Sequence, residues 1–202
     1  MKNSTLSTLR ILLVLTLLLF IGLAAVFILN PQTASNENII TLGGDFTLES
    51  NQGAVSLNDY KGKVVAMYIG YSSCPDVCPT ALAVMTQAFN ALTESEKQQV
   101  AGLFISVDPD RDSPEKLETY VNFFSPMITG LTGEKSKIDA IVKQYGAFYR
   151  KVELQNSAMD YAVDHSSRIY LIDTKGELYQ TLLHNSSPAQ LLTEIRSLIK
   201  QN

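Results

Sequence analysis

Apolar residues first appear along the chain as one unbroken stretch near the N-terminus. Residues 11–29 carry no charge, and only Thr16 and Gly22 interrupt their apolar character. A helix of that length rises about 29 Å, which matches the roughly 30 Å hydrocarbon layer of a bilayer. A cleavable signal peptide would have a shorter apolar region and a small-x-small cleavage site, which residues 30–34 (NPQTA) do not provide. The stretch therefore predicts a transmembrane anchor over 11–29 that is not cleaved.

Charges around this stretch indicate how the chain crosses the membrane. Lys2 and Arg10 lie at or before its start, and the first thirty residues contain no acid. The positive-inside rule then predicts that residues 1–10 stay in the cytoplasm and that the rest of the chain is exported. Residues 30–38 are interpreted as a polar linker, which leaves 39–202 for one domain.

Beyond the linker, apolar patterns of strand and helix length alternate. Residues 64–69 and 101–107 are apolar on both faces, which is typical of strands buried inside a sheet. Between them, Leu82, Met85 and Phe89 recur at helical spacing. By the same criteria, strands are also predicted at 46–48, 55–57, 147–154, 168–172 and 178–182, and helices at 114–124, 132–145 and from 188 onward. This order predicts an α/β domain with one central mixed β-sheet flanked by helices.

Capping signals mark several of the expected helix ends. Ser113 precedes Pro114, so the helix that follows should have a serine N-cap and a proline at its first position. Residues 187–190 (SPAQ) carry the signature of a capping box at the start of the last helix. Gly146 is expected to end the helix at 132–145, because glycine readily adopts the left-handed conformation common at that position.

The net charge of the part predicted to be exported argues against one class of binding partner. The chain has 16 basic and 20 acidic residues, and Lys2 and Arg10 belong to the N-terminal segment. The remaining 14 basic residues against 20 acidic ones give the exported part a net charge of about −6. A nucleic-acid partner is therefore not expected, because it would require a basic face.

The only two cysteines, Cys74 and Cys78, lie between a predicted strand and a predicted helix. If the chain is helical from Pro75 onward, both thiols lie on one face of the first helical turn. They are then close enough for a disulfide or for a shared metal ion. The helix N-terminus favours thiolate, which is the nucleophile of disulfide exchange and a soft ligand for Cu(I) or Zn(II). A purely structural disulfide is unattractive, because so short a loop constrains the unfolded chain little.

Two thiolates do not complete a metal site, and the chain has two histidines that are candidates for a third ligand. His165 lies in a polar segment, 161–167, which is interpreted as a loop just before a strand. Such a loop can fold back over the helix N-terminus. Its neighbour Asp164 is a candidate to orient the ring or to serve as a weak fourth ligand. A lone loop histidine is usually solvated, so the cysteine pair is the reason for choosing His165. His184 is interpreted as a surface residue.

Three acids at alternate positions, Asp108, Asp110 and Asp112, resemble the start of a calcium-binding loop. The match then fails, because Ser113 stands where the loop requires glycine and Thr119 where it requires glutamate. The segment is therefore interpreted as a charged turn before a helix, in which Arg111 balances the acids.

Four segments in this order resemble the SCO/SenC proteins, which assist the assembly of cytochrome c oxidase. They are residues 70–79 (GYSSCPDVCP), 104–114 (FISVDPDRDSP), 130–133 (GLTG) and 161–166 (YAVDHS). The resemblance extends from about residue 43 to residue 200 and includes the N-terminal anchor. The combination is specific, whereas the Cys-x-x-x-Cys spacing alone would be a weak signal.

The resemblance implies a thioredoxin-like fold in which Cys74, Cys78 and His165 bind one copper ion, as Cu(I) or Cu(II). It implies an assembly factor, not an enzyme in the strict sense, that helps to build the dinuclear copper centre of cytochrome c oxidase. The expected partner is the copper-containing subunit of that oxidase or another copper enzyme. A periplasmic copper donor and a thiol reductant are further candidates. No arginine-rich presequence precedes the anchor, which favours a bacterial inner-membrane protein with its domain in the periplasm.

The competing hypothesis is a thiol–disulfide oxidoreductase that reduces the cysteines of a copper-site client without binding metal itself. Cys74 and Cys78 would then be the redox-active pair. His165 discriminates between the two hypotheses, because disulfide exchange has no use for it and a three-ligand site requires it. A peroxidase is not favoured, since residues 71–73 (YSS) do not form the proline- and threonine-rich pocket that peroxide reduction needs.

Overall fold

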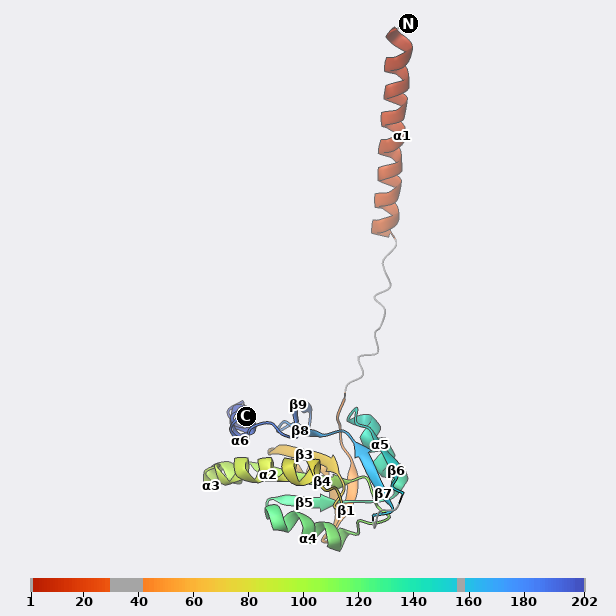
Figure 1. Ribbon diagram of the computed structural model, residues 1–202. Coiled ribbons are helices and arrows are strands. Elements are labelled where there is room, and N and C mark those ends of the chain that lie inside the picture. The colour runs from red at the N-terminus through yellow and green to blue at the C-terminus, as the bar shows by residue number, and fades with distance from the viewer. Residues whose placement is uncertain (1, 30–41, 156–158, 202) are drawn as a thin grey trace. The chain divides into compact units, whose positions relative to one another are not determined.

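A computed structural model describes residues 2–29, 42–155 and 159–201, in two compact units, Met1–Thr41 and Leu42–Asn202. In the first unit, α1 (Lys2–Leu29) is one long helix (Figure 1). Its segment Ser7–Val26 is long and apolar enough to cross a membrane, a test of length and composition that a signal sequence also passes. The predicted linker at 30–38 lies outside the described residues.

The second unit is built on a five-stranded mixed sheet. Its strands are β3 (Val64–Gly70), β4 (Val100–Ser106), β5 (Ile128–Leu131), β8 (Arg168–Ile172) and β9 (Leu178–Leu183), in the order β5-β4-β3-β8-β9. Strands β3, β4 and β5 are parallel, while β8 pairs antiparallel with both β3 and β9. All seven residues of β3 are buried, as expected for a central strand with apolar side chains on both faces.

The edge strand β5 was not predicted from the sequence. It has only four residues, and one of them is Gly130, which has a low propensity for strands. A Cβ atom at Gly130 would lie 2.8 Å from the Cβ of Leu117 and 3.0 Å from its backbone carbon. The glycine therefore allows the helix that carries Leu117 to pack closely on the strand, and pairing with β4 forms the strand.

The predicted central mixed sheet is confirmed, but two hairpins, whose predicted strands were expected to belong to it, form separate sheets. One hairpin pairs β1 (Thr47–Ser50) with β2 (Gly53–Ser56). The other pairs β6 (Tyr149–Glu153) with β7 (Tyr161–His165), in a register that places Tyr149 opposite His165. Each forms its own antiparallel sheet, separate from the five-stranded one.

The helices begin and end close to the positions that the capping signals predict. They are α2 (Val77–Asn90), α3 (Glu94–Lys97), α4 (Pro114–Phe124), α5 (Lys135–Gln144) and α6 (Pro188–Ile199), with a short 3₁₀ turn, η1 (Leu57–Tyr60). The hydroxyl of Ser113 accepts a hydrogen bond from the Lys116 amide, and that of Ser187 accepts one from the Gln190 amide. Gly146 has φ +60°, so the predicted glycine stop after α5 is confirmed.

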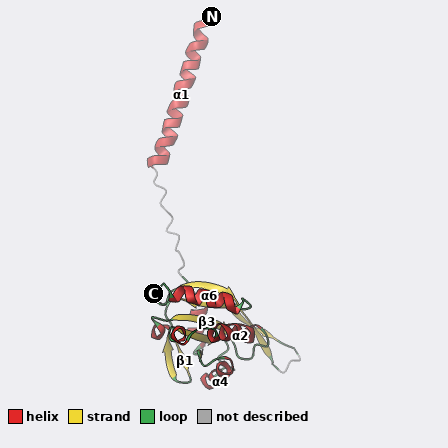
Figure 2. Cartoon of the chain, turned by 90° about the vertical axis from the view of Figure 1, so that its left-hand side faces the viewer, coloured by secondary structure: helices red, strands yellow, loops and turns green. Residues whose placement is uncertain are grey.

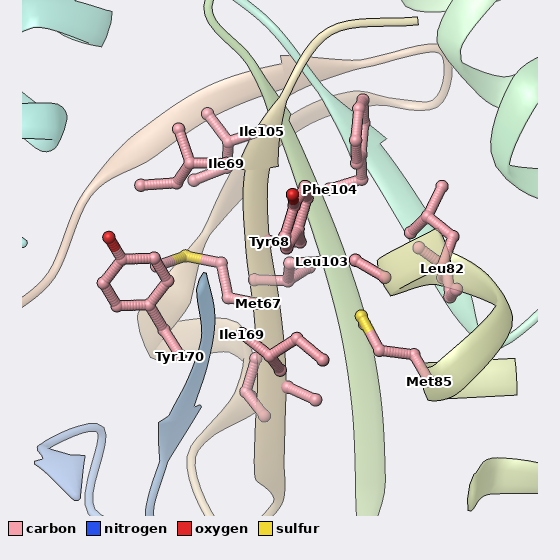
Figure 3. Packing of buried hydrophobic residues seen from close by; sticks show 14 of the residues in the cluster. Met67, Tyr68, Ile69, Leu82, Met85, Leu103, Phe104, Ile105, Ile169 and Tyr170 are labelled. Carbon is pink, nitrogen blue, oxygen red and sulfur yellow. The ribbon is translucent and has the colours of Figure 1, made fainter. Parts of the chain in front are cut away.

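The hydrophobic core lies on both faces of the central sheet. Figure 3 shows Met67 and Tyr170 on one side of the sheet, and Leu82 and Met85 of α2 on the other. Tyr145, which caps α5, meets Tyr170 edge to face with ring centroids 5.9 Å apart, so α5 covers the first side. Helices α2 and α6 pack side by side on the other (Figure 2). The sheet is thus covered on both sides, and β3 leads directly into the cysteine segment.

Candidate metal centre

The two cysteines lie where β3 leads into α2, but they do not share the first helical turn as expected. Helix α2 begins at Val77, so Cys78 lies in its first turn and Cys74 in the loop before it. Cys74 precedes Pro75, and a residue before proline is disfavoured in helical conformation. Asp76 also has non-helical backbone angles, φ −140° and ψ −74°. The loop places the Cys74 thiol beside the helix N-terminus instead of on the helix surface.

His165 is brought to the cysteines by a strand, and the predicted polar loop is wrong. It is the last residue of β7, which pairs with β6. The polar side chains of Asp164 and His165 concealed the strand in the sequence, since the segment lacks the apolar alternation typical of strands. The carbonyl of Ser166 lies 3.3 Å from His165 Nδ1, and Cys78 Sγ lies 3.3 Å from His165 Nε2.

The Sγ atoms of Cys74 and Cys78 and a ring nitrogen of His165 converge on one point. These three donor atoms all lie within 4.8 Å of one another. Cys78 has no exposed surface and Cys74 retains 9%, while His165 is half-buried. Among the described residues, no further Cys, His, Asp or Glu joins the group.

Aromatic rings enclose the histidine. Tyr68 and Tyr71 both meet the imidazole edge to face, with ring centroids 6.0 Å and 5.7 Å away. Burial raises the pKa of the Tyr68 phenol well above its usual range, so this group stays neutral. The rings restrict how the imidazole can turn, which favours the orientation with Nε2 toward Cys78.

Gly70, the last residue of β3, leaves the space that the Cys78 sulfur occupies. A Cβ atom at this position would lie 2.6 Å from Cys78 Sγ, which is closer than such atoms can approach. Glycine at the end of the central strand is therefore required for the observed position of the thiol.

Asp164 does not contact the imidazole, so its expected role beside His165 is wrong. Successive side chains of a strand point to opposite faces, which turns Asp164 away from the site. Its carboxylate instead accepts hydrogen bonds from Arg150 on β6, at 3.0 Å from Nε and 2.9 Å from Nη2. His184 is half-buried, not at the surface as expected, and its Nδ1 atom is buried without a hydrogen bond.

The two thiols differ in their affinity for a proton. The Cys78 thiol donates a hydrogen bond to Cys74 and is the main cause that lowers the pKa of Cys74 to about 3. His165 and the backbone amides of Asp76 and Cys78 act in the same direction, against the effect of burial. Burial raises the pKa of Cys78 well above its usual range, and its bond to Cys74 adds to this. At neutral pH the pair therefore consists of one thiolate and one thiol.

This arrangement permits two kinds of chemistry. Two sulfur ligands and one imidazole form a soft donor set that suits Cu(I), a copper state that accepts few ligands, or Zn(II). A thiolate beside a second thiol is also the arrangement that disulfide exchange uses, with Cys74 as the attacking group. The donor set therefore fits a copper ion, and the thiol pair fits redox chemistry with or without one.

Residues 108–112 precede α4, as the predicted charged turn should, but the sequence did not predict that two of the three acids are buried. Asp108 and Asp112 are buried, with 0% and 1% of their surface exposed, whereas Asp110 is exposed and pairs with Lys151. The expected pairing of Arg111 with the acids is confirmed for Asp108. Sequence reasoning missed the role of Asp112 because its main partner, Ser72, lies forty residues away along the chain.

Known proteins resemble this chain over most of its length. An SCO2-like protein of Rickettsia conorii is 32% identical over 201 residues, which cover 95% of this chain and 97% of that protein. The mitochondrial protein SCO2 of Saccharomyces cerevisiae is 35% identical over 162 residues, which cover 80% of this chain and 54% of that protein.

Solved structures of related proteins are also similar to this chain over most of its length. Bradyrhizobium japonicum ScoI with copper bound has 32% identity and a TM-score of 0.70, over 78% of this chain and 99% of that one. Yeast Sco1 with copper bound has 33% identity and a TM-score of 0.71, over 80% of this chain and 90% of that one. The thioredoxin-like fold that the motifs implied is therefore confirmed. The SCO1/SenC family model matches residues 34–200, and the chain belongs to that family.

Proposed function

We propose that the chain binds one copper ion through Cys74, Cys78 and His165 and helps to build the copper centre of cytochrome c oxidase. The observation that carries this proposal is the convergence of the three donor atoms within 4.8 Å, in a family whose solved members include proteins with copper bound. The partner is the copper-containing subunit of the oxidase or another copper enzyme. Copper is in this case the cargo of the protein.

Copper fits the donor set better than zinc does. Protein zinc sites that serve a structural role are almost always four-coordinate, and the described residues offer three ligands. Sulfur ligands also select Cu(I), since both are soft. The Cys74 thiolate is ready to bind, whereas Cys78 must lose its proton when the ion enters. We therefore expect copper uptake to release about one proton per ion near neutral pH.

The reduction of client cysteines is the second candidate function, and the thiolate–thiol pair favours it. The Cys74 thiolate would attack a disulfide sulfur of the client, forming a mixed disulfide and releasing one client thiolate. Cys78, after losing its proton, would then attack Cys74 and release the second client sulfur. The client gains two electrons, and Cys74 and Cys78 are oxidised to a disulfide.

For the whole chain we propose a single-pass protein of a bacterial inner membrane. Residues 11–29 form the anchor, 1–10 lie in the cytoplasm, and the linker 30–38 connects the anchor to the periplasmic domain 39–202. The apolar helix, the basic residues near its start and the bacterial relatives from Rickettsia support this proposal.

Copper titration tests the three-ligand model. The reduced full-length chain in detergent is expected to take up one copper ion, measured against a competing chelator. His165→Ala should lower the affinity by at least about tenfold, because a third of the ligands is lost. His184→Ala is the matched control and should bind as wild type does. The model is wrong if His165→Ala and wild type bind copper equally tightly.

The same preparations separate the two functions. Metal-free wild type and His165→Ala are each mixed with an oxidised peptide that carries the cysteines of a copper centre. Reduction by both would support the redox function, which does not require the histidine as a metal ligand. Failure of both to reduce the peptide would leave copper delivery alone.

A further inference from the structure

One short loop contacts both halves of the candidate centre. It consists of residues 108–112, two residues beyond the end of β4, and is called here the acidic loop. Its residues bond to the cysteine loop on one side and to the hairpin that carries His165 on the other. Neither set of bonds reaches the three donor atoms themselves.

The first set of bonds comes from Asp112. Its carboxylate accepts hydrogen bonds from the backbone amide and the hydroxyl of Ser72, at 2.8 Å and 2.5 Å. It also accepts bonds from the Ser106 hydroxyl at 2.6 Å and from Lys116 Nζ at 3.0 Å. Burial opposes the charge, but these bonds together hold the pKa of Asp112 below its usual range. Ser72 lies two residues before Cys74, so Asp112 fixes the start of the cysteine loop.

The second set of bonds comes from Arg111. Its Nη1 atom donates to the carbonyl of Tyr161 at 3.0 Å and to that of Met159 at 3.1 Å, and its guanidinium lies 3.7 Å above the Tyr161 ring. Asp108 accepts hydrogen bonds from both Arg111 Nε and the Tyr161 hydroxyl, at 2.5 Å and 2.7 Å. Tyr161 begins β7 and His165 ends it, so Arg111 fixes one end of the strand that carries the histidine.

The acidic loop is itself held firmly. The amides of Arg111 and Asp112 donate to the Asp108 carbonyl at 3.1 Å and 3.0 Å. The Asp108 amide donates to the Ser106 hydroxyl at 3.1 Å, which ties the loop to the end of β4. Both sets of bonds therefore start from one tight turn on the central sheet.

We infer that the acidic loop positions the two halves of the centre separately, Asp112 placing the cysteine pair and Arg111 placing His165. A shift of the cysteine loop alters both the thiol chemistry and metal binding, since both use the same sulfur atoms. A shift of β7 removes the third ligand but leaves the two sulfur atoms in place, because Cys78 belongs to α2, Cys74 to the loop before it, and neither to β7. The histidine half of this inference rests on the proposed copper site, and the cysteine half does not.

Two variants of the full-length chain test this division. Asp112→Asn keeps the size of the side chain but removes its charge, and Arg111→Lys keeps the charge but removes the planar group that bonds two carbonyls at once. Each variant is measured in two ways: the reduction potential of the metal-free cysteine pair in glutathione buffers, and the copper affinity against a chelator.

We expect Asp112→Asn to shift the potential and to lower the copper affinity. Arg111→Lys should lower the copper affinity about tenfold or more while the potential shifts less than in Asp112→Asn, since residues that orient metal ligands typically contribute 10- to 100-fold to affinity. Tyr161→Phe removes the hydroxyl that donates to Asp108 and should act as Arg111→Lys does, more weakly. This third variant preserves the test if Arg111→Lys does not fold.

The matched controls lie elsewhere in the same domain. Asp173 accepts two backbone hydrogen bonds in the turn between β8 and β9, and Arg196 bonds the Glu96 carboxylate and the Ala91 carbonyl. Asp173→Asn and Arg196→Lys should therefore leave both the potential and the copper affinity unchanged.

The inference is overturned if Asp112→Asn and Arg111→Lys leave both quantities at wild-type values, or if both variants change them in the same proportion. If wild type itself takes up no copper, the proposed function fails. The cysteine half is then decided by whether Asp112→Asn shifts the potential of the thiol pair.

Discussion

Each of the three donor residues of the candidate centre is positioned or stabilised by a neighbouring residue, and each neighbour acts in a different way. Gly70 leaves space for the Cys78 sulfur, and Cys78 donates the hydrogen bond that stabilises the Cys74 thiolate. The imidazole of His165 is enclosed by Tyr68 and by a second tyrosine ring. The cysteine spacing and the family resemblance together predicted the three donor residues, but they did not predict these supports, because the supports depend on side-chain packing across the fold.

The lowered pKa of Cys74 predicts an unusual pH dependence of its alkylation. An ordinary thiol, with a pKa of about 8.5, loses nearly tenfold in thiolate for each pH unit below that value. The pKa of Cys74 is lowered to about 3, so the group is ionised throughout the range above that pH. The rate of iodoacetamide reaction with the metal-free chain should therefore change little between about pH 5 and pH 8.

A substitution of Cys78, which donates the hydrogen bond to Cys74, provides the control. Cys78→Ala removes the main cause of the lowered pKa and should make the alkylation rate at Cys74 rise steeply with pH. Equal pH profiles for wild type and Cys78→Ala would contradict the assigned thiolate–thiol pair.

Gly70→Ala should weaken the centre by displacing the Cys78 sulfur. The added Cβ would lie 2.6 Å from Sγ, so the thiol must move, and we expect copper affinity to fall about tenfold or more. Gly133→Ala is a matched control, because its Cβ would meet Leu48 at 2.9 Å in the core. It should lower the free energy of unfolding without the tenfold change in copper affinity. A Gly70→Ala chain that binds copper as wild type does would show that Gly70 has no such role.

Among the helices and strands, the sequence best predicted those whose signals lie within the segment itself. The buried strand at 64–69 and the caps at Ser113 and Ser187 were confirmed, because a continuous apolar run and a serine before a helix are local signals. Strands β5 and β7 were missed, since they form by pairing with β4 and β6 and lack a pattern of their own. The role of the acidic loop was missed for the same reason, as its partners are distant in the sequence.

Loss of one of these caps should affect stability alone. Ser187→Ala removes the hydroxyl that accepts the Gln190 amide at the start of α6 and should lower the free energy of unfolding by about 1 kcal/mol. Urea unfolding of the full-length chain, followed by circular dichroism, measures this loss. Thr193→Ala, in the same helix but away from its end, is the control and should cost less. Copper affinity should remain that of wild type in both, because α6 contributes no donor atom.

At the scale of the whole molecule, the candidate centre belongs entirely to the unit Leu42–Asn202. The proposed anchor lies in the other unit, so the proposed copper binding and the proposed membrane attachment belong to different parts of the chain. The net charge of about −6 for the chain without Lys2 and Arg10 follows from the sequence and needs no structure. In the proposed topology, the orientation of α1 decides which side of the membrane the centre faces.

Cysteine labelling in cells tests that orientation. A maleimide that does not cross the inner membrane should label Cys74 in intact cells whose outer membrane has been made permeable, because the proposed topology places 39–202 in the periplasm. In a chain without Cys74 and Cys78, a cysteine introduced by Ser4→Cys should react only after the inner membrane is disrupted. The opposite labelling pattern would refute the proposed topology.

The different depths of the two sulfur atoms determine the order of events at the centre. Cys78 has no exposed surface, whereas Cys74 retains 9% and His165 is half-buried. A group from a client can therefore contact Cys74 and His165, whereas Cys78 offers it no surface. In the proposed copper transfer, a departing ion would exchange its bonds with Cys74 and His165 first and with Cys78 last. The proposed transfer would then be stepwise, with a fixed order of ligands.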